Sequence, residues 1–187
     1  ERMRIDSSGN VILAAGTGTL QTATAGTGNF RAGVNAGNSI IAGGNYNVLV
    51  GDEAGTAITT GDYNVAVGYL ALPADTLGNR STAIGVAALE TQNFTSATDA
   101  YNTAVGFAAG SGVTTGIQNT LIGGIAGDSL TEGTRNVAVG TDALGADTKG
   151  SKSVAIGLNA LALQNFTSAT DVYNTAVGTN AGLSVTT

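Results

Sequence analysis

Carboxylates are the side chains of this sequence best suited to catalysis, because the chain contains no histidine and no cysteine. Without those residues a Ser-His-Asp or Cys-His nucleophile is impossible, and zinc lacks its usual ligands. A pair of carboxylates flanking a glycosidic bond could still hydrolyse it. The candidate acids are Asp52, Glu53, Asp75, Glu90, Asp99, Asp128, Glu132, Asp142, Asp147 and Asp171.

The positions of these acids favour a non-catalytic role. Most lie at variable positions between copies of a repeated motif, and no insertion is long enough to build a cleft. No EF-hand or GGxGxD pattern indicates calcium, and no GxxxxGK[ST] loop indicates a nucleotide. We therefore predict a protein that is not an enzyme and has no cofactor or metal. The alternatives are a fibre-borne polysaccharide-degrading enzyme and Ca²⁺ at a stacked Asp/Asn turn.

The octapeptide QNFTSATD occurs twice, at residues 92–99 and 164–171. Aromatic rings in and beside it could stack on sugars or anchor a protein interface. The alternative is that Phe94 and Phe166 fill the end of a wider coil. If any part of the chain projects toward a partner, we expect it to be these segments. The candidate exposed contact residues are Asn93, Phe94, Thr95, Asp99, Asn165, Phe166, Thr167 and Asp171.

A nine-residue motif recurs through most of the chain and must position these segments. It reads NVLVGDEAG from Asn47, NVAVGYLAL from Asn64 and STAIGVAAL from Ser81, and continues to NTAVGTNAG from Asn174, with a degenerate copy from Asn29. From Gly51 to Gly178 its glycines are 17, 17, 21, 17, 17, 17 and 21 residues apart. The octapeptide lies in both 21-residue coils. The chain therefore contains a 17-residue coil inside a 72-residue super-repeat.

A period of 17 residues is too short for paired helices and suits one turn of a β-solenoid. Three apolar or β-branched residues precede each motif glycine, which is typical of a short buried strand. We predict an all-β protein, a parallel β-solenoid or β-roll of about nine coils. The β-roll occupies residues 29–187, and its ending SVTT matches GVTT of 112–115, so we expect the section to be truncated mid-repeat.

Asparagine and glycine recur at fixed places in the motif. Asparagine suits turn geometry and can form an amide ladder between stacked coils, whereas glycine supplies positive φ or room for a neighbouring backbone. We expect a structural role for Asn47, Gly51, Asn64, Gly68, Gly85, Asn102, Gly106, Asn119, Gly123, Asn136, Gly140, Gly157, Asn174 and Gly178.

The three strand residues predict two uncharged faces. Side chains alternate along a strand, so Val67 shares a face with Val65 while Ala66 points the other way. We expect the alanine face to meet solvent in an isolated solenoid, yet it carries no charge in any regular copy. Both faces therefore look buried, and the second is expected to meet other copies of the chain.

The pattern NTAVGFAAG…VTTGIQNTLIGGIAG resembles the head repeats of trimeric autotransporter (YadA-like) adhesins. That resemblance implies a left-handed parallel β-roll in which three identical chains pack around an axis, so that the solenoid is assembled as a homotrimeric fibre. The 17-residue coil with TTG before the next Asn is more similar to bacteriophage tail-fibre repeats, as is MRIDSSGNV near the N-terminus. Adhesin head coils are typically shorter, so their loop geometry does not transfer directly.

These observations predict a structural and adhesive section of a phage tail fibre that mediates host attachment, with a bacterial adhesin head as the alternative. Its partners would be two identical chains and a host-surface glycan or protein, in an extracellular, virion-borne location or on a bacterial surface. The net charge of −6 argues against nucleic acid. No apolar run approaches the roughly 18 residues that span a bilayer, so we predict no membrane insertion in this section.

Residues 1–28 lack the motif. Met3 and Ile5 alternate with polar residues, as do Val11 and Leu13, which predicts a hairpin turning at 8–10. A Gly/Thr-rich connector would then lead to the first coil.

Overall fold

The computed structural model describes residues 3–5, 11–13 and 25–187. Within these ranges every regular element is a strand, which confirms the all-β class. Near the N-terminus, β1 (Met3–Ile5) and β2 (Val11–Leu13) pair antiparallel, with Met3 opposite Leu13, as the alternation predicted. The turn of that hairpin and most of the predicted connector lie outside the described residues.

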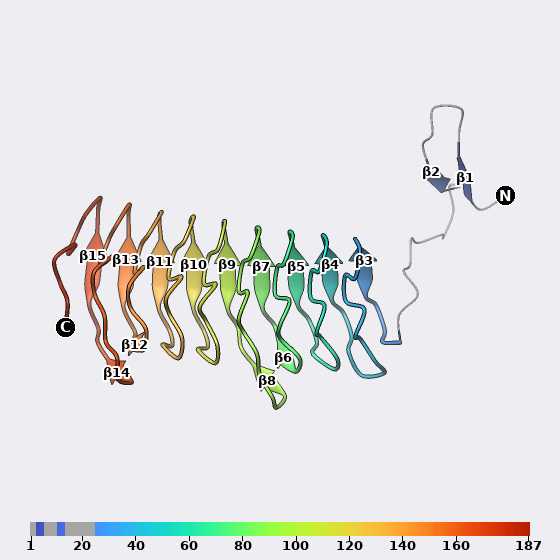
Figure 1. Cartoon of the computed structure of the whole chain (residues 1–187), viewed down its shortest axis with the longest axis horizontal. Coiled ribbons are helices and arrows are strands. Elements are labelled where there is room, and N and C mark those ends of the chain that lie inside the picture. Colours follow the sequence, from blue (N-terminus) through green and yellow to red (C-terminus); the bar gives the residue numbers. More distant parts are fainter. Residues whose placement is uncertain (1–2, 6–10, 14–24) are drawn as a thin grey trace.

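Nine short strands, one from each coil, form one parallel sheet that runs along the rod (Figure 1). Neighbouring strands align in register, so that Ala66 faces Ala83 and Ala83 faces Ala104. The predicted solenoid of about nine turns is therefore confirmed. In sheet order the strands are β3 (Phe30–Ala32), β4 (Val48–Val50), β5 (Val65–Val67), β7 (Thr82–Ile84), β9 (Thr103–Val105), β10 (Thr120–Ile122), β11 (Val137–Val139), β13 (Val154–Ile156) and β15 (Thr175–Val177).

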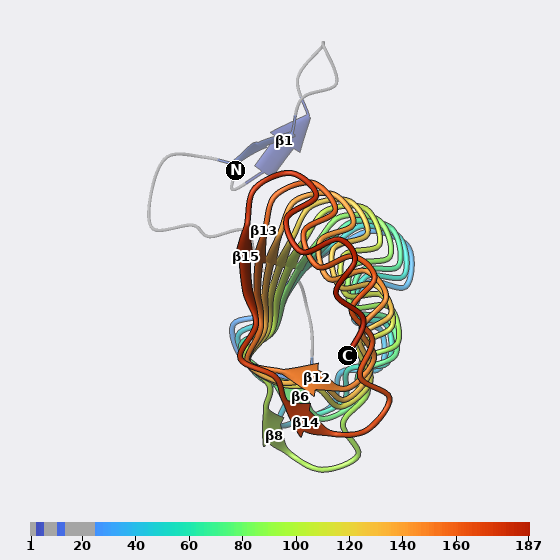
Figure 2. The ribbon, with the colours of Figure 1, turned by 90° about the vertical axis from the view of Figure 1, so that its left-hand side faces the viewer.

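Two further parallel pairs mark the 21-residue coils. β6 (Gly78–Asn79) pairs with β8 (Thr98–Asp99), and β12 (Gly150–Ser151) pairs with β14 (Thr170–Asp171). Each pair joins a long coil to the coil before it. The segments that carry β8 and β14 extend beyond the other coils, on the side where the strands of the large sheet begin (Figures 1 and 2).

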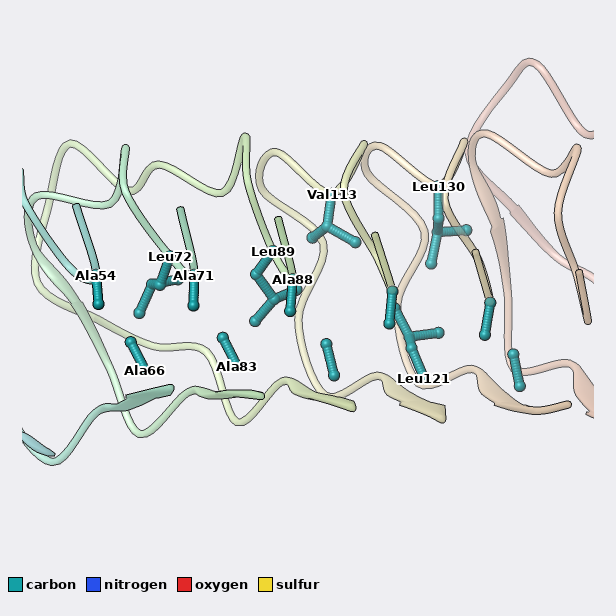
Figure 3. Packing of buried hydrophobic residues seen from close by; sticks show 14 of the residues in the cluster. Ala54, Ala66, Ala71, Leu72, Ala83, Ala88, Leu89, Val113, Leu121 and Leu130 are labelled. Atoms are coloured by element: carbon teal, nitrogen blue, oxygen red, sulfur yellow. The ribbon is translucent and has the colours of Figure 1, made fainter. Parts of the chain in front are cut away.

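Small and large side chains compensate one another in the interior, within a coil or between neighbouring coils. Where the strand centre is Ala66 or Ala83, the motif ends in a fully buried leucine, Leu72 or Leu89. Figure 3 shows these side chains pointing into the space between the walls of the coil. Where the strand centre is Leu49, the motif ends in a glycine instead, Gly55, at which a Cβ would lie 2.7 Å from the Leu49 Cδ2. The coil of Ala104 also ends in a glycine, Gly110, at which a Cβ would lie 2.6 Å from Leu121 Cδ1 of the next coil, so this glycine leaves room for a leucine in the neighbouring coil.

The motif glycines form the corner at which each strand ends. Gly68 has φ +135°, and a Cβ there would lie 2.5 Å from the carbonyl oxygen of Gly85 in the next coil. All the motif glycines have φ between 127° and 140°. The positive φ and the close approach of the next coil both require glycine, as the sequence predicted for Gly51, Gly68, Gly85, Gly106, Gly123, Gly140 and Gly157. Gly178, in the last coil, shares the φ but meets no neighbouring backbone within 4 Å.

Candidate functional site

The outer face of the nine-stranded sheet is apolar and partly exposed. Each strand of this sheet turns its first and third residues outward. In the eight strands of the sheet that follow β3, these residues are Val, Ile or Thr. Ile84, Ile122 and Ile156 are each 38% exposed. No charged side chain interrupts this outer face in any of the nine strands. We call these outward residues the sheet face.

The prediction of which side is buried was wrong. Ala66, Ala83, Ala104, Ala138 and Ala155 are fully buried inside the solenoid, and the Val, Ile and Thr side chains face outward. The physical reason is room: inside the solenoid the strand-centre alanines share the interior with leucines from their own or a neighbouring coil, such as Leu72 and Leu89. The face without a covering layer is therefore the one that carries the Val, Ile and Thr side chains.

The motif asparagines form a buried ladder along the solenoid. The Nδ2 of Asn47 donates to the carbonyl oxygen of Gly61 at 2.9 Å, and its Oδ1 accepts the backbone N–H of Asn64 at 2.8 Å. The same two bonds recur at Asn64, Asn119 and Asn136. Each side chain thus satisfies its own coil and links it to the next, mostly through backbone groups rather than amide to amide.

The ladder changes where serine replaces asparagine, and the octapeptide fills the gap. At Ser81 the buried Gln92 side chain enters: its Nε2 donates to Asp75 Oδ2 at 2.6 Å and to Ser81 Oγ at 2.9 Å. Its Oε1 accepts from Asn102 Nδ2 at 2.8 Å, which restores the ladder. Gln92 is fully buried, so the first residue of the octapeptide is an interior residue.

The second octapeptide repeats this arrangement. Gln164 Nε2 donates to Asp147 Oδ2 at 2.6 Å and to Ser153 Oγ at 3.2 Å, and Gln164 Oε1 accepts from Asn174 Nδ2 at 2.7 Å. The copied sequence therefore carries a copied buried network.

Asp75 is buried, and each carboxylate oxygen has a partner. Oδ1 accepts the backbone N–H groups of Gly78 and Phe94, and Oδ2 accepts from Gln92. Burial nevertheless raises the pKa of Asp75 above its ordinary value, because desolvation outweighs those hydrogen bonds. Its partners are backbone and amide groups of the coil, so the geometry gives this candidate acid a structural role.

The octapeptide residues divide between interior and surface. Phe94, predicted to be an exposed contact residue, is only 6% exposed because the wider coil closes over it, and Phe166 is half-buried. The alternative reading of these rings as fillers therefore fits Phe94 best. Asn93 and Asn165 each accept a hydrogen bond from a threonine hydroxyl of the preceding coil, at 3.1 and 3.0 Å. Thr95, Asp99, Thr167 and Asp171 are exposed.

Exposed cations pair with the last residue of each octapeptide. Arg80 Nε lies 3.1 Å from Asp99 Oδ1, and Lys152 Nζ lies 2.6 Å from Asp171 Oδ2. Lys152 and Tyr173 hold the pKa of Asp171 below its usual range, with the Lys152 hydrogen bond as the main cause. These charges are satisfied locally and do not form a cluster of like sign.

A column of left-handed residues borders the sheet face where its strands begin. Each lies immediately before a motif, and their φ values run from 50° to 65° although none is glycine. We call it the pre-strand column: Tyr46, Tyr63, Arg80, Tyr101, Gln118, Arg135, Lys152 and Tyr173. Tyr46 and Tyr63 stack at 5.1 Å between ring centroids, and the Arg80 guanidinium lies over Tyr63 and Tyr101.

A second column borders the other edge of the sheet face. Its members directly follow the motif glycines, and we call it the post-glycine column: Asp52, Tyr69, Val86, Phe107, Gly124, Thr141, Leu158 and Thr179. Phe107 is 65% exposed and Tyr69 is 52% exposed. These two rings therefore stand exposed beside the sheet face.

Among the described residues, no three acidic side chains come together as metal ligands would, and no helix is long and apolar enough to cross a membrane. Comparisons with protein-family models, with curated proteins and with solved structures find no match to this chain.

Proposed function

We propose that this chain is a structural and adhesive section of a homotrimeric fibre, the tail fibre of a phage, which carries host attachment. The observation that carries the proposal is the uncharged sheet face, which runs unbroken along nine coils. A soluble rod needs a partner surface that buries this face. The simplest partner with the same length and the same coil repeat is another copy of the rod.

The size of the sheet face supports a partner. With about 4.8 Å per strand and three residues per strand, it measures roughly 40 Å by 10 Å, or on the order of 400 Å² before flanking residues are added. The largest apolar patch of a soluble monomer covers about 300–600 Å² and is often functional, and this face reaches that range before its flanking residues are added.

The regularity of the sheet face supports a second copy over an unrelated partner. Its residues repeat at every coil, so a matching surface must repeat with the same spacing. A parallel rod of the same sequence has that spacing by construction. Three rods are proposed because the motif resembles repeats whose solenoids pack as trimers.

The attachment role follows from the assembly. A stiff trimer presents each projecting octapeptide segment three times, so weak contacts to a host glycan or protein would add up through avidity. The proposed location is therefore the outside of a virion. The gene that continues this chain would separate the two origins: an intramolecular chaperone domain supports a phage fibre, and a membrane anchor supports a bacterial adhesin.

The mass in solution tests the assembly. Light scattering on the purified chain should give three times the chain mass of 18.3 kDa. Ile84→Lys with Ile122→Lys, which places charges on the sheet face, should lower that mass without loss of the β circular dichroism signal. The matched control is Ser129→Lys, at an exposed position away from the sheet, which should stay trimeric. A parent chain that is a stable monomer would overturn the proposal.

A further inference from the structure

We infer that the seam between neighbouring chains is formed by two different columns: the post-glycine column of one chain packs against the pre-strand column of the next. This inference rests on the proposed assembly and specifies its geometry. The partner is a second copy of this chain, in parallel orientation and with coils at the same height.

Symmetry supplies the first step. The post-glycine column lies where the sheet strands end, and the pre-strand column lies where they begin, so the two columns occupy opposite edges of the sheet face. Figure 2, which looks along the rod, shows the sheet as one wall of the coil with a corner at each edge. Any rotation about an axis parallel to the rod, with sheet faces inward, brings one edge against the opposite edge of the neighbour.

The rotation also keeps coils at equal height. Residues of one coil therefore meet residues of the same coil in the neighbouring chain. Tyr69 would meet Tyr63, and Phe107 would meet Tyr101, because each pair belongs to a single coil. Antiparallel rods would instead place each column against its own kind.

The residue types of the two columns match at these heights. In the first three regular coils after Gly51, Tyr69, Val86 and Phe107 stand opposite Tyr63, Arg80 and Tyr101. The four aromatic residues of this set are between 48% and 65% exposed in the single chain. Aromatic pairs and a guanidinium beside rings are favourable contacts when covered.

In the other coils the pairs are mixed, with Asp52 opposite Tyr46, Leu158 opposite Lys152 and Thr179 opposite Tyr173. Thr141 stands opposite Arg135, Gly124 opposite Gln118, and no pair at one height brings two like charges together. A Cβ added to Gly124 would meet no atom within 4 Å, so that part of the seam has open space. The aromatic match is thus confined to the coils of Tyr69, Val86 and Phe107, and the remaining pairs bring no like charges together.

Engineered cysteines test the seam cleanly, because the natural chain has none. Phe107→Cys with Tyr101→Cys should yield disulfide-linked dimers and trimers on a non-reducing gel after oxidation by oxygen with copper phenanthroline. The two positions in one chain are separated by the whole strand, roughly 20 Å, and a disulfide needs Cα atoms within about 7 Å. Any bridge is therefore between chains.

Three controls make the result decisive. Either cysteine alone should give no disulfide-linked product. Phe107→Cys with Lys152→Cys should also give no disulfide-linked product, because these positions belong to coils three apart and lie roughly 14 Å apart along the rod. The polar pair Thr141→Cys with Arg135→Cys should cross-link like the aromatic pair. Because this variant keeps Phe107, it tests the seam even where loss of Phe107 weakens assembly.

The outcomes separate the two proposals. Cross-linking of the same-coil pairs alone supports the seam. A second result is a trimer by light scattering in which neither same-coil pair, Phe107/Tyr101 or Thr141/Arg135, reacts with oxygen or with a short bis-maleimide. That result overturns the seam and leaves the proposed assembly intact. Cross-linking of a single-cysteine variant also overturns it, because equal columns would then meet. A monomeric parent overturns both.

Discussion

The chain contains two copies of a four-coil block, residues 46–115 and 118–187, and the two differ where they face solvent far more than where they face inward. The buried network of Asp75 and Gln92 recurs as Asp147 and Gln164, and the Nε2–Oδ2 distance is 2.6 Å in both. The strand centres, motif glycines and ladder asparagines are also the same in both blocks.

The surfaces of the blocks have diverged. Tyr69 and Phe107 of the first block correspond to Thr141 and Thr179 of the second. The comparison teaches that interior packing and backbone geometry are kept in both blocks, although exposed octapeptide residues such as Thr95 and Thr167 are identical too. It also explains much of the repeated octapeptide: its glutamine completes the buried ladder, its asparagine binds the preceding coil, and its aspartate pairs with a cation in both copies.

Loss of a motif glycine should have the largest effect, and the effect should be equal in the two blocks. Gly68→Ala and Gly140→Ala each place a Cβ about 2.5 Å from the next glycine's carbonyl oxygen, at φ +135° and +132°. We expect each to lower the free energy of unfolding by about 3 to 5 kcal/mol, measured by urea titration at one fixed protein concentration.

The control for that pair is Gly124→Ala, where a Cβ would meet nothing within 4 Å. It should change the free energy of unfolding by less than about 1 kcal/mol. A similar loss at Gly124 and Gly68 would show that the close approach between coils is not the cause.

Removal of the buried glutamine should have the next largest effect. Gln92→Ala leaves Asp75 Oδ2 and Asn102 Nδ2 without these partners inside the solenoid. We expect a loss of about 2 to 4 kcal/mol, and the same for Gln164→Ala, by urea unfolding. The exposed octapeptide residues Thr95 and Thr167 are the controls, and their alanine variants should stay close to the parent. A tolerated Gln92→Ala would mean that the octapeptide is not an interior element.

Much of this fold could be read from the sequence, because coil length, strand position and corner glycines follow from one repeated pattern. The orientation of the strands could not be read from alternation alone, since neither face of a three-residue strand carries charge. A readable signal did exist: Leu49 and Leu121 at strand centres are matched by Gly55 and Gly127 at motif ends. That exchange identifies the strand centre as an inward position.

The interior role of the octapeptide also had a signal in the sequence. The signal is the residue seven positions after the motif glycine. In the first block this residue is Ile58 or Val113 in coils whose motif ends in glycine. It is Asp75 or Gln92 in coils whose motif ends in leucine. This interior position is thus polar only beside the serines that interrupt the asparagine ladder. The burial of Phe94 had no such marker, because it depends on how the extra four residues close.

The buried carboxylate predicts a pH dependence. Burial raises the pKa of Asp75 in the folded chain above its ordinary value of 3.8. Its ionisation is therefore easier in the unfolded chain, so its contribution to stability is full below about pH 3.8 and is lost as pH rises through the folded pKa. The non-titrating Asp75→Asn variant provides the reference. The parent's advantage in unfolding free energy over this variant should shrink between pH 3.5 and 7, and an advantage that grows over that range would mean that hydrogen bonding outweighs burial.

The smallest effect is expected from moving surface residues of the first block into the second. Thr141→Tyr with Thr179→Phe installs the aromatic rings at exposed positions of the post-glycine column. Because neither position packs into the interior, the free energy of unfolding of the chain should change by less than about 0.5 kcal/mol per site. Urea unfolding under conditions in which parent and variant have the same mass gives the measurement. A loss of 2 kcal/mol or more would show that the corner positions contribute to coil packing, and the division between a conserved interior and a variable surface would then fail at this column.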